Sequence, residues 1–273
     1  MKKQLSPVLF LPHGGGPLPL LGDANHQEML KFLQEIIPRL GVPASILIIS
    51  AHWEEETVTI TSGKNPSLIY DYYGFPEESY QLKYPAPGDP VLAQKIANLL
   101  RENGIESKLS AQRGFDHGVF VPLKILFPQA NIPCVQLSLL NNLDPESHLK
   151  IGKALSKLRS ENTLIIGSGL SFHNMQSLMA QQKSLDHKNE EFEMWLNDTC
   201  TNENYSTSVR EQKLIKWSEA PFARYCQPRE EHLLPLHVCA GAGGSAAKLV
   251  FDGKIMGKKT SAFFVELICL EFG

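Results

Sequence analysis

Short apolar runs of strand length alternate with amphipathic helical patterns over most of the 273-residue chain. The runs are rich in β-branched residues, which favours buried strands at residues 8–11, 46–50, 58–61, 134–137 and 164–167. Apolar residues at spacings of three and four predict helices at residues 27–40, 90–102, 148–158 and 188–195. This alternation predicts an α/β fold with a central, largely parallel mixed sheet flanked by helices. The last segment, 261–272, alternates imperfectly and is expected to form an antiparallel or edge strand.

No internal repeat, low-complexity tract or linker interrupts this pattern, so residues 1–273 are predicted to form a single domain. A hydrophobic content of 42% and a charged content of 20% are typical of an ordinary globular protein. The stretch 65–90 is rich in Pro, Gly and Tyr and is too long for a simple turn, which indicates a functional loop. Its tyrosines either cover an aromatic ligand or pack the loop itself, and packing is favoured; they are Tyr72, Tyr73, Tyr80 and Tyr84.

The net charge and the cysteines indicate which classes of partner and which cellular compartment to expect. A net charge of -3 argues against nucleic-acid binding, because phosphate recognition needs clustered Lys and Arg. No apolar run approaches the roughly 18 residues of a membrane span, and prolines interrupt the apolar stretch at the N-terminus, so neither a membrane segment nor a signal peptide is expected. Five scattered cysteines without a CxxC pair fit neither a disulfide framework nor a zinc ribbon and indicate a reducing cytoplasm. A small-molecule partner is expected, and homo-oligomerisation is left open.

Three histidines come directly after predicted strands. His13 ends VLFLPH, His52 ends ILIISAH, and His173 ends TLIIGSGLSFH. Ligands of open parallel sheets bind outside the carboxyl ends of the strands, so side chains in these positions can converge on one pocket. A single histidine of this kind usually marks only the edge of a sheet. Three of them in one chain favour a shared site.

Two further histidines are candidates for the same site. His232 in PREEHLLPLH lies near the start of a predicted helix, and the preceding Glu230 or Glu231 could replace it as a ligand. His117 in FDHGVFVPL precedes an apolar helical run and either contacts a polarised oxygen or caps the helix. His237 lies about 140° around a helix from His232 and is predicted to pack in the core. Three histidines in polar contexts are predicted to lie on the surface: His26, His148 and His187.

Neutral imidazoles from separate strands, with open coordination positions, suit either zinc or non-haem iron(II). The residue types alone do not choose between the two metals. Serine hydrolase chemistry fits poorly because no GxSxG elbow is present, and the GGGP that follows His13 matches no phosphate-binding pattern. If the metal is iron, three ligands on one face leave the other face for a diol and dioxygen, and oxidative ring cleavage becomes feasible.

An ordered set of motifs resembles the LigB-type class III extradiol dioxygenases, and within them the 4,5-DOPA extradiol dioxygenase branch. The motifs cover residues 7–245 and read LPHGGGP, SAHWE, YDYYGFPEESYQLKYPAPG, FDHGVFVPL, GSGLSFHNM and PREEHLLPLHVCAGA. The resemblance implies a single-domain α/β enzyme that inserts both atoms of O2 into a catechol-type substrate, with L-DOPA and 4,5-cleavage as the expectation for the branch.

The resemblance also assigns roles to residues. It places His13, His52 and His232 as ligands of one divalent metal per chain, although other class III enzymes use a glutamate at the third position, which leaves Glu231 as an alternative. His173 matches the acid-base histidine and His117 a second active-site histidine. Iron(II) is expected for ring cleavage, and zinc is a plausible metal to find bound because imidazole sites hold it more tightly.

Two other functions compete with this interpretation. One is a non-enzymatic interaction protein of the Memo group, which resembles this family in architecture. The other is a zinc-dependent hydrolase, in which a metal-bound water attacks a carbonyl. The presence of both His117 and His173 beside the expected ligands favours an enzyme, and the absence of HExxH argues against a hydrolase.

Overall fold

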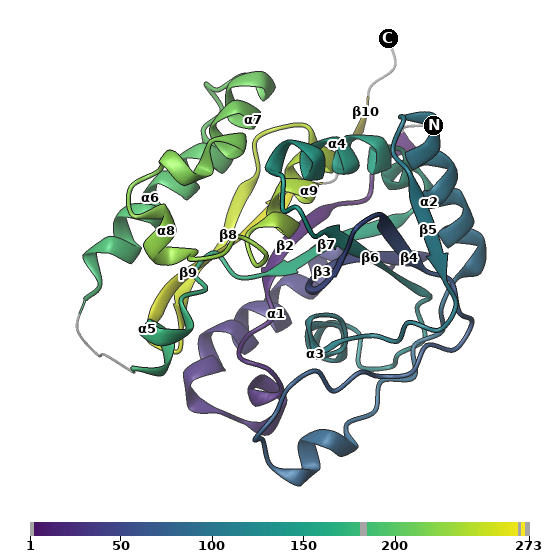
Figure 1. Cartoon of the computed structure of the whole chain (residues 1–273), viewed down its shortest axis with the longest axis horizontal. Helices are drawn as coiled ribbons and strands as arrows, with labels where there is room; N and C mark the ends of the chain where they lie inside the picture. Colours follow the sequence, from purple (N-terminus) through teal and green to yellow (C-terminus); the bar gives the residue numbers. More distant parts are fainter. Residues whose placement is uncertain (1–2, 181–184, 267–268, 271–273) are drawn as a thin grey trace.

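The computed structural model describes residues 3–180, 185–266 and 269–270, and its centre is an eight-stranded mixed sheet (Figure 1). The strand order is β5–β4–β6–β3–β7–β2–β9–β8. The strands are β2 Val8–Pro12, β3 Ser45–Glu55, β4 Val58–Thr61, β5 Ser107–Ser110, β6 Cys134–Leu140, β7 Thr163–Gly169, β8 Lys248–Ile255 and β9 Lys258–Val265. Two short strands, β1 Lys3–Gln4 and β10 Cys269–Leu270, pair with each other.

The middle of the sheet is parallel. Strand β7 pairs in parallel with both β2 and β3, and β3 pairs in parallel with β6. Strands β9 and β8 extend the sheet in antiparallel fashion beyond β2. Pro12 lies opposite Gly169, and Ser50 lies opposite Ser168, so β2, β7 and β3 reach the same edge of the sheet. The predicted α/β fold with a largely parallel mixed sheet is confirmed.

Both faces of the sheet are covered, which explains the continuous apolar runs of the central strands. In β2, Val8 and Phe10 belong to the core on one face, whereas Leu9 and Leu11 belong to the core on the other. The first core includes residues of α2, α4, α6, α7 and α9, and the second includes residues of α1 and α3. Figure 1 shows α4 and α9 packed together on the side of the sheet away from α1 and α3.

The apolar spacing of a helix matches the face that it buries, as α1 shows. Helix α1 buries Met29, Phe32, Leu33, Ile36 and Leu40, a spacing of three and four that lines one face. The helices are α1 Gln27–Leu40, α2 Pro90–Glu102, α3 His117–Leu126, α4 Pro145–Leu155, α5 Met175–Met179, α6 His187–Thr201, α7 Thr207–Ile215, α8 Ala223–Cys226 and α9 Leu234–Gly243. Within the described ranges, none of them has the length and apolar character that a membrane span needs.

Most predicted elements are present, with one shift that concerns the site. Helices α1 and α2 and strand β4 have the predicted bounds. Strand β3 continues past Ser50 to Glu55, so His52 lies within a strand and not after it, which corrects the prediction. Strands β5 and β8 were not predicted. The expected final strand corresponds to β9, which is antiparallel to both neighbours, and residues 267–268 and 271–273 lie outside the described residues.

One buried carboxyl group makes the stability of this fold depend on pH. Glu193 on α6 is fully buried against β9, where its Oε2 accepts a hydrogen bond of 2.5 Å from Ser261. Its Oε1 has no hydrogen-bond partner among the described residues. Burial raises the pKa of Glu193 to about 7 from an ordinary value of 4.5, against the opposing effect of the serine hydroxyls. The folded state therefore keeps this proton to higher pH than the unfolded state, and the stability falls as the pH rises from 4.5 to 7.

We predict that Glu193→Gln removes this loss of stability. The wild type should lose up to about 3 kcal/mol in free energy of unfolding as the pH rises from low values to above the folded pKa of Glu193. The variant should not show this loss. Urea unfolding at about pH 5 and about pH 8 measures the difference. The matched control is Glu191→Gln, which changes an exposed residue on the same helix. Parallel pH profiles for Glu193→Gln and the wild type would contradict the prediction.

Candidate metal centre and active site

His13 directly follows β2 and is buried at the carboxyl edge of the sheet. Its Nδ1 lies 3.2 Å from Oγ of Ser168, on the parallel neighbour β7. The Ser168 hydroxyl donates its hydrogen to the carbonyl oxygen of Gly118. The serine oxygen therefore accepts from the Nδ1–H of His13. This pairing selects the tautomer in which Nε2 of His13 carries a lone pair.

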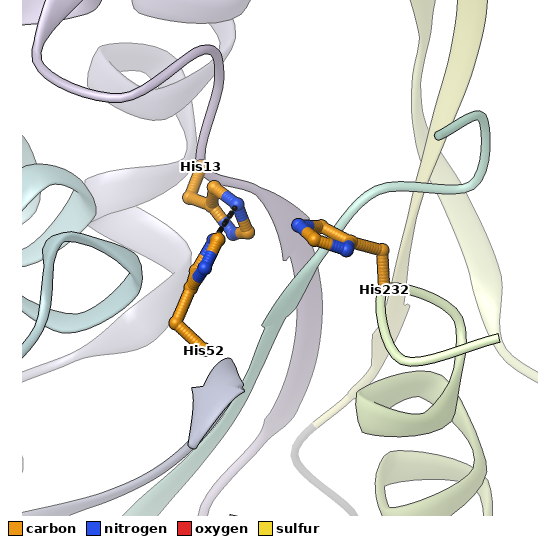
Figure 2. Close-up of side chains that lie close together, drawn as sticks. All are labelled: His13, His52 and His232. Carbon is orange, nitrogen blue, oxygen red and sulfur yellow. Dashed lines mark hydrogen bonds between the residues drawn. The ribbon is translucent and has the colours of Figure 1, made fainter. Parts of the chain in front are cut away.

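His52 comes from β3, where the pairing with β6 shifts register between Ile49 and Glu54. The irregularity bends the strand and re-aims its side chains at the sheet edge. Nε2 of His52 lies 3.0 Å from Nε2 of His13, the contact drawn as a dashed line in Figure 2. Both nitrogens cannot carry protons at this distance, so at least one presents a lone pair to the other.

His232 reaches the same point from the turn before α9 and completes a group of three (Figure 2). Its ring centroid lies 5.3 Å from that of His13 and 4.9 Å from that of His52. One ring nitrogen from each of the three histidines lies within 4.8 Å of the other two. Nδ1 of His232 lies 2.9 Å from Oε1 of Glu231, which leaves its Nε2 unengaged.

Glu231 orients two histidines with one oxygen. Its Oε1 lies 3.1 Å from Nδ1 of His173 as well as 2.9 Å from Nδ1 of His232. The two rings are stacked, with centroids 3.3 Å apart. Burial alone would raise the pKa of Glu231, but the hydrogen bond from His173 and the nearby positive charges lower it below its ordinary value. This position behind the two rings favours His232, and not Glu231, as the third member of the group with His13 and His52.

His117 is the first residue of α3 and is held by a second carboxylate. Its backbone N–H and its Nδ1 lie 3.0 and 2.9 Å from Oδ1 of Asp71. The ring lies 3.9 Å from that of His52, whose Nδ1 is 3.7 Å from the other oxygen of Asp71. Burial alone would raise the pKa of Asp71, but the hydrogen bonds and charge of His117 lower it to about 2. Asp71 is therefore a permanent anion behind both rings.

The three grouped histidines are electrically neutral near pH 7. Burial lowers the pKa of His13, His52 and His232 well below 6.5, and repulsion among the neighbouring imidazoles lowers it further. Neutral imidazole is the form that binds a divalent metal. The donor set of three imidazoles from separate segments therefore fits zinc or non-haem iron(II).

A buried network beneath the group supports the backbone of His52. Asp116 accepts hydrogen bonds from Ser50 at 2.7 Å, Gln136 at 2.5 Å and Arg113 at 3.0 Å. The Ser50 hydroxyl oxygen also accepts from the backbone N–H of His52 at 3.2 Å. Asp116 is fully buried and ties β3, β6 and the start of α3 together behind His52.

All five histidines line one cavity of about 460 Å³. The glycine loop after His13, the loop around Tyr72, helix α5 and the tip of the β8–β9 hairpin form its other walls. Packing by its own tyrosines, the favoured role of the tyrosine-rich loop, is seen in the structure, whereas a role over an aromatic ligand stays a prediction. Tyr72 and Tyr84 pack the loop, with hydroxyl groups bonded to the carbonyl oxygens of Ser79 and Phe127. Tyr73 is 89% exposed at the mouth of the cavity.

Residues 7–263 match the family described as the catalytic LigB subunit of aromatic ring-opening dioxygenase. The chain belongs to the LigB family. A dioxygenase named tasH from Hapsidospora irregularis is 42% identical to it, over 90% of this chain and 80% of that protein. A 4,5-DOPA dioxygenase extradiol from Beta vulgaris is 36% identical, over 91% of this chain and 93% of that protein.

A solved structure agrees with this assignment to the LigB family. The crystal structure of an uncharacterized protein from Escherichia coli K12 aligns with 95% of this chain and 99% of its own, with a TM-score of 0.78 and 27% identity. The family resemblance that the motifs indicated is confirmed, and this LigB chain is a member of a family of extradiol-type ring-cleaving dioxygenases.

The structure brings together every histidine singled out as a site residue of this LigB chain. Outside the site, His237 is buried between the carbonyl oxygens of Leu233 and Leu214, as predicted. The surface prediction holds for His187 but is wrong for His26 and His148, which are fully buried.

Buried His26 supports the glycine loop of the LigB site. Its Nε2 accepts from the backbone N–H of Gly15 at 3.0 Å, and its Nδ1 lies 2.7 Å from Asp23. Gly14 has a φ of +82°, and a Cβ there would come within 2.6 Å of Pro19. Only glycine allows the chain to turn this tightly after His13.

Sequence patterns missed the polar residues that orient the histidines. Asp71 is the one charged residue in the YDYYG segment, Asp116 immediately precedes His117, and Ser168 lies in the GSG at the end of β7. Each of these positions carried a weak local signal, because a polar residue beside a strand end or a helix start is also common without a site.

We predict that Ser168→Ala weakens metal binding by about 10- to 100-fold, because Nδ1 of His13 loses the oxygen that fixes its tautomer. Competition with a chromophoric chelator, using zinc, measures the affinity. Ser45→Ala is the matched control. Ser45 is buried like Ser168, but it lies on β3 and its hydroxyl bonds Thr163, at the end of β7 that is far from the site. Wild-type affinity in Ser168→Ala would show that this hydrogen bond does not orient His13.

Proposed function

We propose that this chain is a metal-dependent extradiol dioxygenase that inserts both atoms of O2 into a catechol-type ring. The observation that carries the proposal is the convergence of three neutral imidazoles at one end of an apolar cavity, with two more histidines, each paired to a carboxylate, beside them. A metal-binding group alone would also suit a hydrolase. The two extra histidine–carboxylate pairs supply the proton-handling groups that ring cleavage requires.

His13, His52 and His232 are the residues that would hold the metal. Iron(II) bound by these imidazoles would accept the two oxygens of a chelating diol together with O2 and pass electrons between them. Zinc in a purified sample would be compatible with this proposal, because imidazole sites bind zinc more tightly than iron(II).

His173 is proposed as the acid-base group. Its Nδ1 is engaged by Glu231, so Nε2 is the atom free to take a proton from a catechol hydroxyl and to return it later. The Glu231 carboxylate, 3.1 Å from Nδ1, would stabilise the positive charge that the ring then gains.

His117 is proposed to donate a hydrogen bond to an oxygen that becomes negatively charged during the reaction. Asp71 engages its Nδ1 and its backbone N–H, so the ring is fixed in direction and only Nε2 is free to face the cavity. A donor held in place before the reaction begins stabilises developing charge without the cost of reorganisation.

The names of the relatives make L-DOPA, with 4,5-cleavage, the first specific substrate to test.

We also place the reaction in the reducing cytoplasm. The four cysteines whose side chains are described are free and buried, which is usual for proteins of that compartment; they are Cys134, Cys200, Cys226 and Cys239.

The decisive experiment measures oxygen uptake and visible absorbance after anaerobic loading with iron(II), with L-DOPA and a panel of simpler catechols. We expect one O2 per catechol and a yellow ring-fission product. Absence of uptake with every catechol, in protein shown to contain iron, would refute the proposed function.

We predict that His173→Ala lowers turnover by about 10²- to 10⁴-fold while leaving the metal content unchanged. His13→Ala should lose the metal itself, and exposed His187→Ala should behave like the wild type. Metal analysis beside the uptake assay separates these outcomes. Equal loss of metal from His173→Ala and His13→Ala would overturn the acid-base role.

A further inference from the structure

The two ends of the cavity differ in polarity. One end carries the five histidines, whereas the rest is lined by glycines, by Thr260 and by apolar or aromatic side chains. No Lys, Arg, Asp or Glu side chain lines it among the residues that the structure describes. The apolar end therefore offers no described charge that could pair with an ionised group on a ligand.

Two cations behind these walls, Lys258 and Arg229, already have carboxylate partners. Lys258 is buried behind Phe172, with Nζ 5.6 Å from the ring centroid, and it pairs with Asp186 at 2.5 Å. On the other side, Arg229 pairs with Glu54 and Glu231. Recruiting either cation for a ligand would leave a partly buried carboxylate without its partner, which is costly.

The cavity is larger than a bare catechol needs. Its volume of about 460 Å³ falls within the range of roughly 300–1,000 Å³ that is usual for sites holding drug-sized ligands. A diol placed against the histidines leaves the apolar end to be filled by a substituent on the ring. Filling it with uncharged carbon would release water from apolar walls.

Apolar side chains continue from the cavity onto its rim. Met179 is 72% exposed, Met175 is 47% exposed, and both line the cavity from α5. Met256 lines the same cavity from the tip of the β8–β9 hairpin, beside the glycine loop, where a Cβ on Gly15 would lie 3.1 Å from its sulfur. Methionine is flexible and polarizable, so three of them around one opening can adapt to apolar groups of different shape.

We propose that this site takes catechols whose ring substituent is apolar and uncharged, and that Met175, Met179 and Met256 determine this specificity. The proposal rests on the proposed catechol chemistry and deepens it. It ranks the zwitterionic side chain of L-DOPA below an alkyl chain of the same length, because burying an ammonium and a carboxylate without partners is unfavourable.

Binding to zinc-loaded protein tests this without turnover, because zinc does not undergo redox chemistry. Isothermal titration with catechol and its 4-methyl, 4-ethyl and 4-propyl derivatives should show affinity rising about fourfold per carbon, the equivalent of ~0.8 kcal/mol per buried CH2. L-DOPA should bind at least about tenfold more weakly than 4-propylcatechol, its uncharged counterpart of equal chain length.

A charge placed on the rim tests the role of the methionines. Met179→Lys should strengthen the binding of 3,4-dihydroxyphenylacetate by about two- to fivefold, the size of an exposed ion pair, and should weaken the binding of 4-propylcatechol. Met194→Lys is the matched control, since Met194 is 66% exposed on α6 and lies outside the cavity. It should leave both affinities unchanged.

The outcomes separate this inference from the proposed function. If iron-loaded protein cleaves catechols but L-DOPA binds as tightly as 4-propylcatechol, the apolar-substituent proposal is wrong and the dioxygenase proposal stands. If the two lysine variants behave alike, the methionines do not set specificity. If no catechol binds and none is cleaved, both proposals fall.

Discussion

Five imidazole rings packed at one edge of a sheet impose the main constraint on this structure. Rings with centroids 3.3 to 5.3 Å apart cannot all be protonated, and burial together with mutual repulsion lowers the pKa of His13, His52 and His232 well below its ordinary value. Oxygen acceptors behind the rings then fix which ring nitrogens face inward. Ser168, Asp71 and Glu231 engage Nδ1 of four of the histidines, which assigns the tautomers without placing a carboxylate inside the group of three nitrogens.

The parallel sheet brings the first of these rings together. Strand β7 pairs in parallel with both β2 and β3, so register brings His13 and its acceptor Ser168 to the sheet edge that β3 also reaches, and the irregular pairing of β3 with β6 aims His52 toward them. His117 and His232 come from segments outside these strands. His117 depends on a loop carboxylate at Asp71, and His232 arrives from the turn before α9, which packs on the same sheet. Fold and site therefore share the same backbone constraints.

The sequence predicted helices and strands correctly where the apolar periodicity matches the buried positions. It failed where the two differ. Helix α1 and strand β4 were predicted to the residue because their apolar spacing matches their buried faces. Strand β8 was missed because its residues are mostly exposed, and the irregular end of β3 was missed because a register shift has no periodic signature. His26 looked like a surface residue because its neighbours are polar, yet tertiary contacts bury it completely.

The two ends of the cavity differ in how they are built, and this difference bears on how such a site can diversify. His13 and His52 are held by central strands, and the Asp116 network of buried hydrogen bonds lies behind His52, so a substitution there disturbs the sheet itself. Part of the apolar wall comes from the short helix α5 and a hairpin tip, whose methionines are partly exposed. Side chains can change on that wall at little cost in stability. Substitutions in the apolar wall can therefore change which groups fit the cavity without disturbing the end that holds the five histidines.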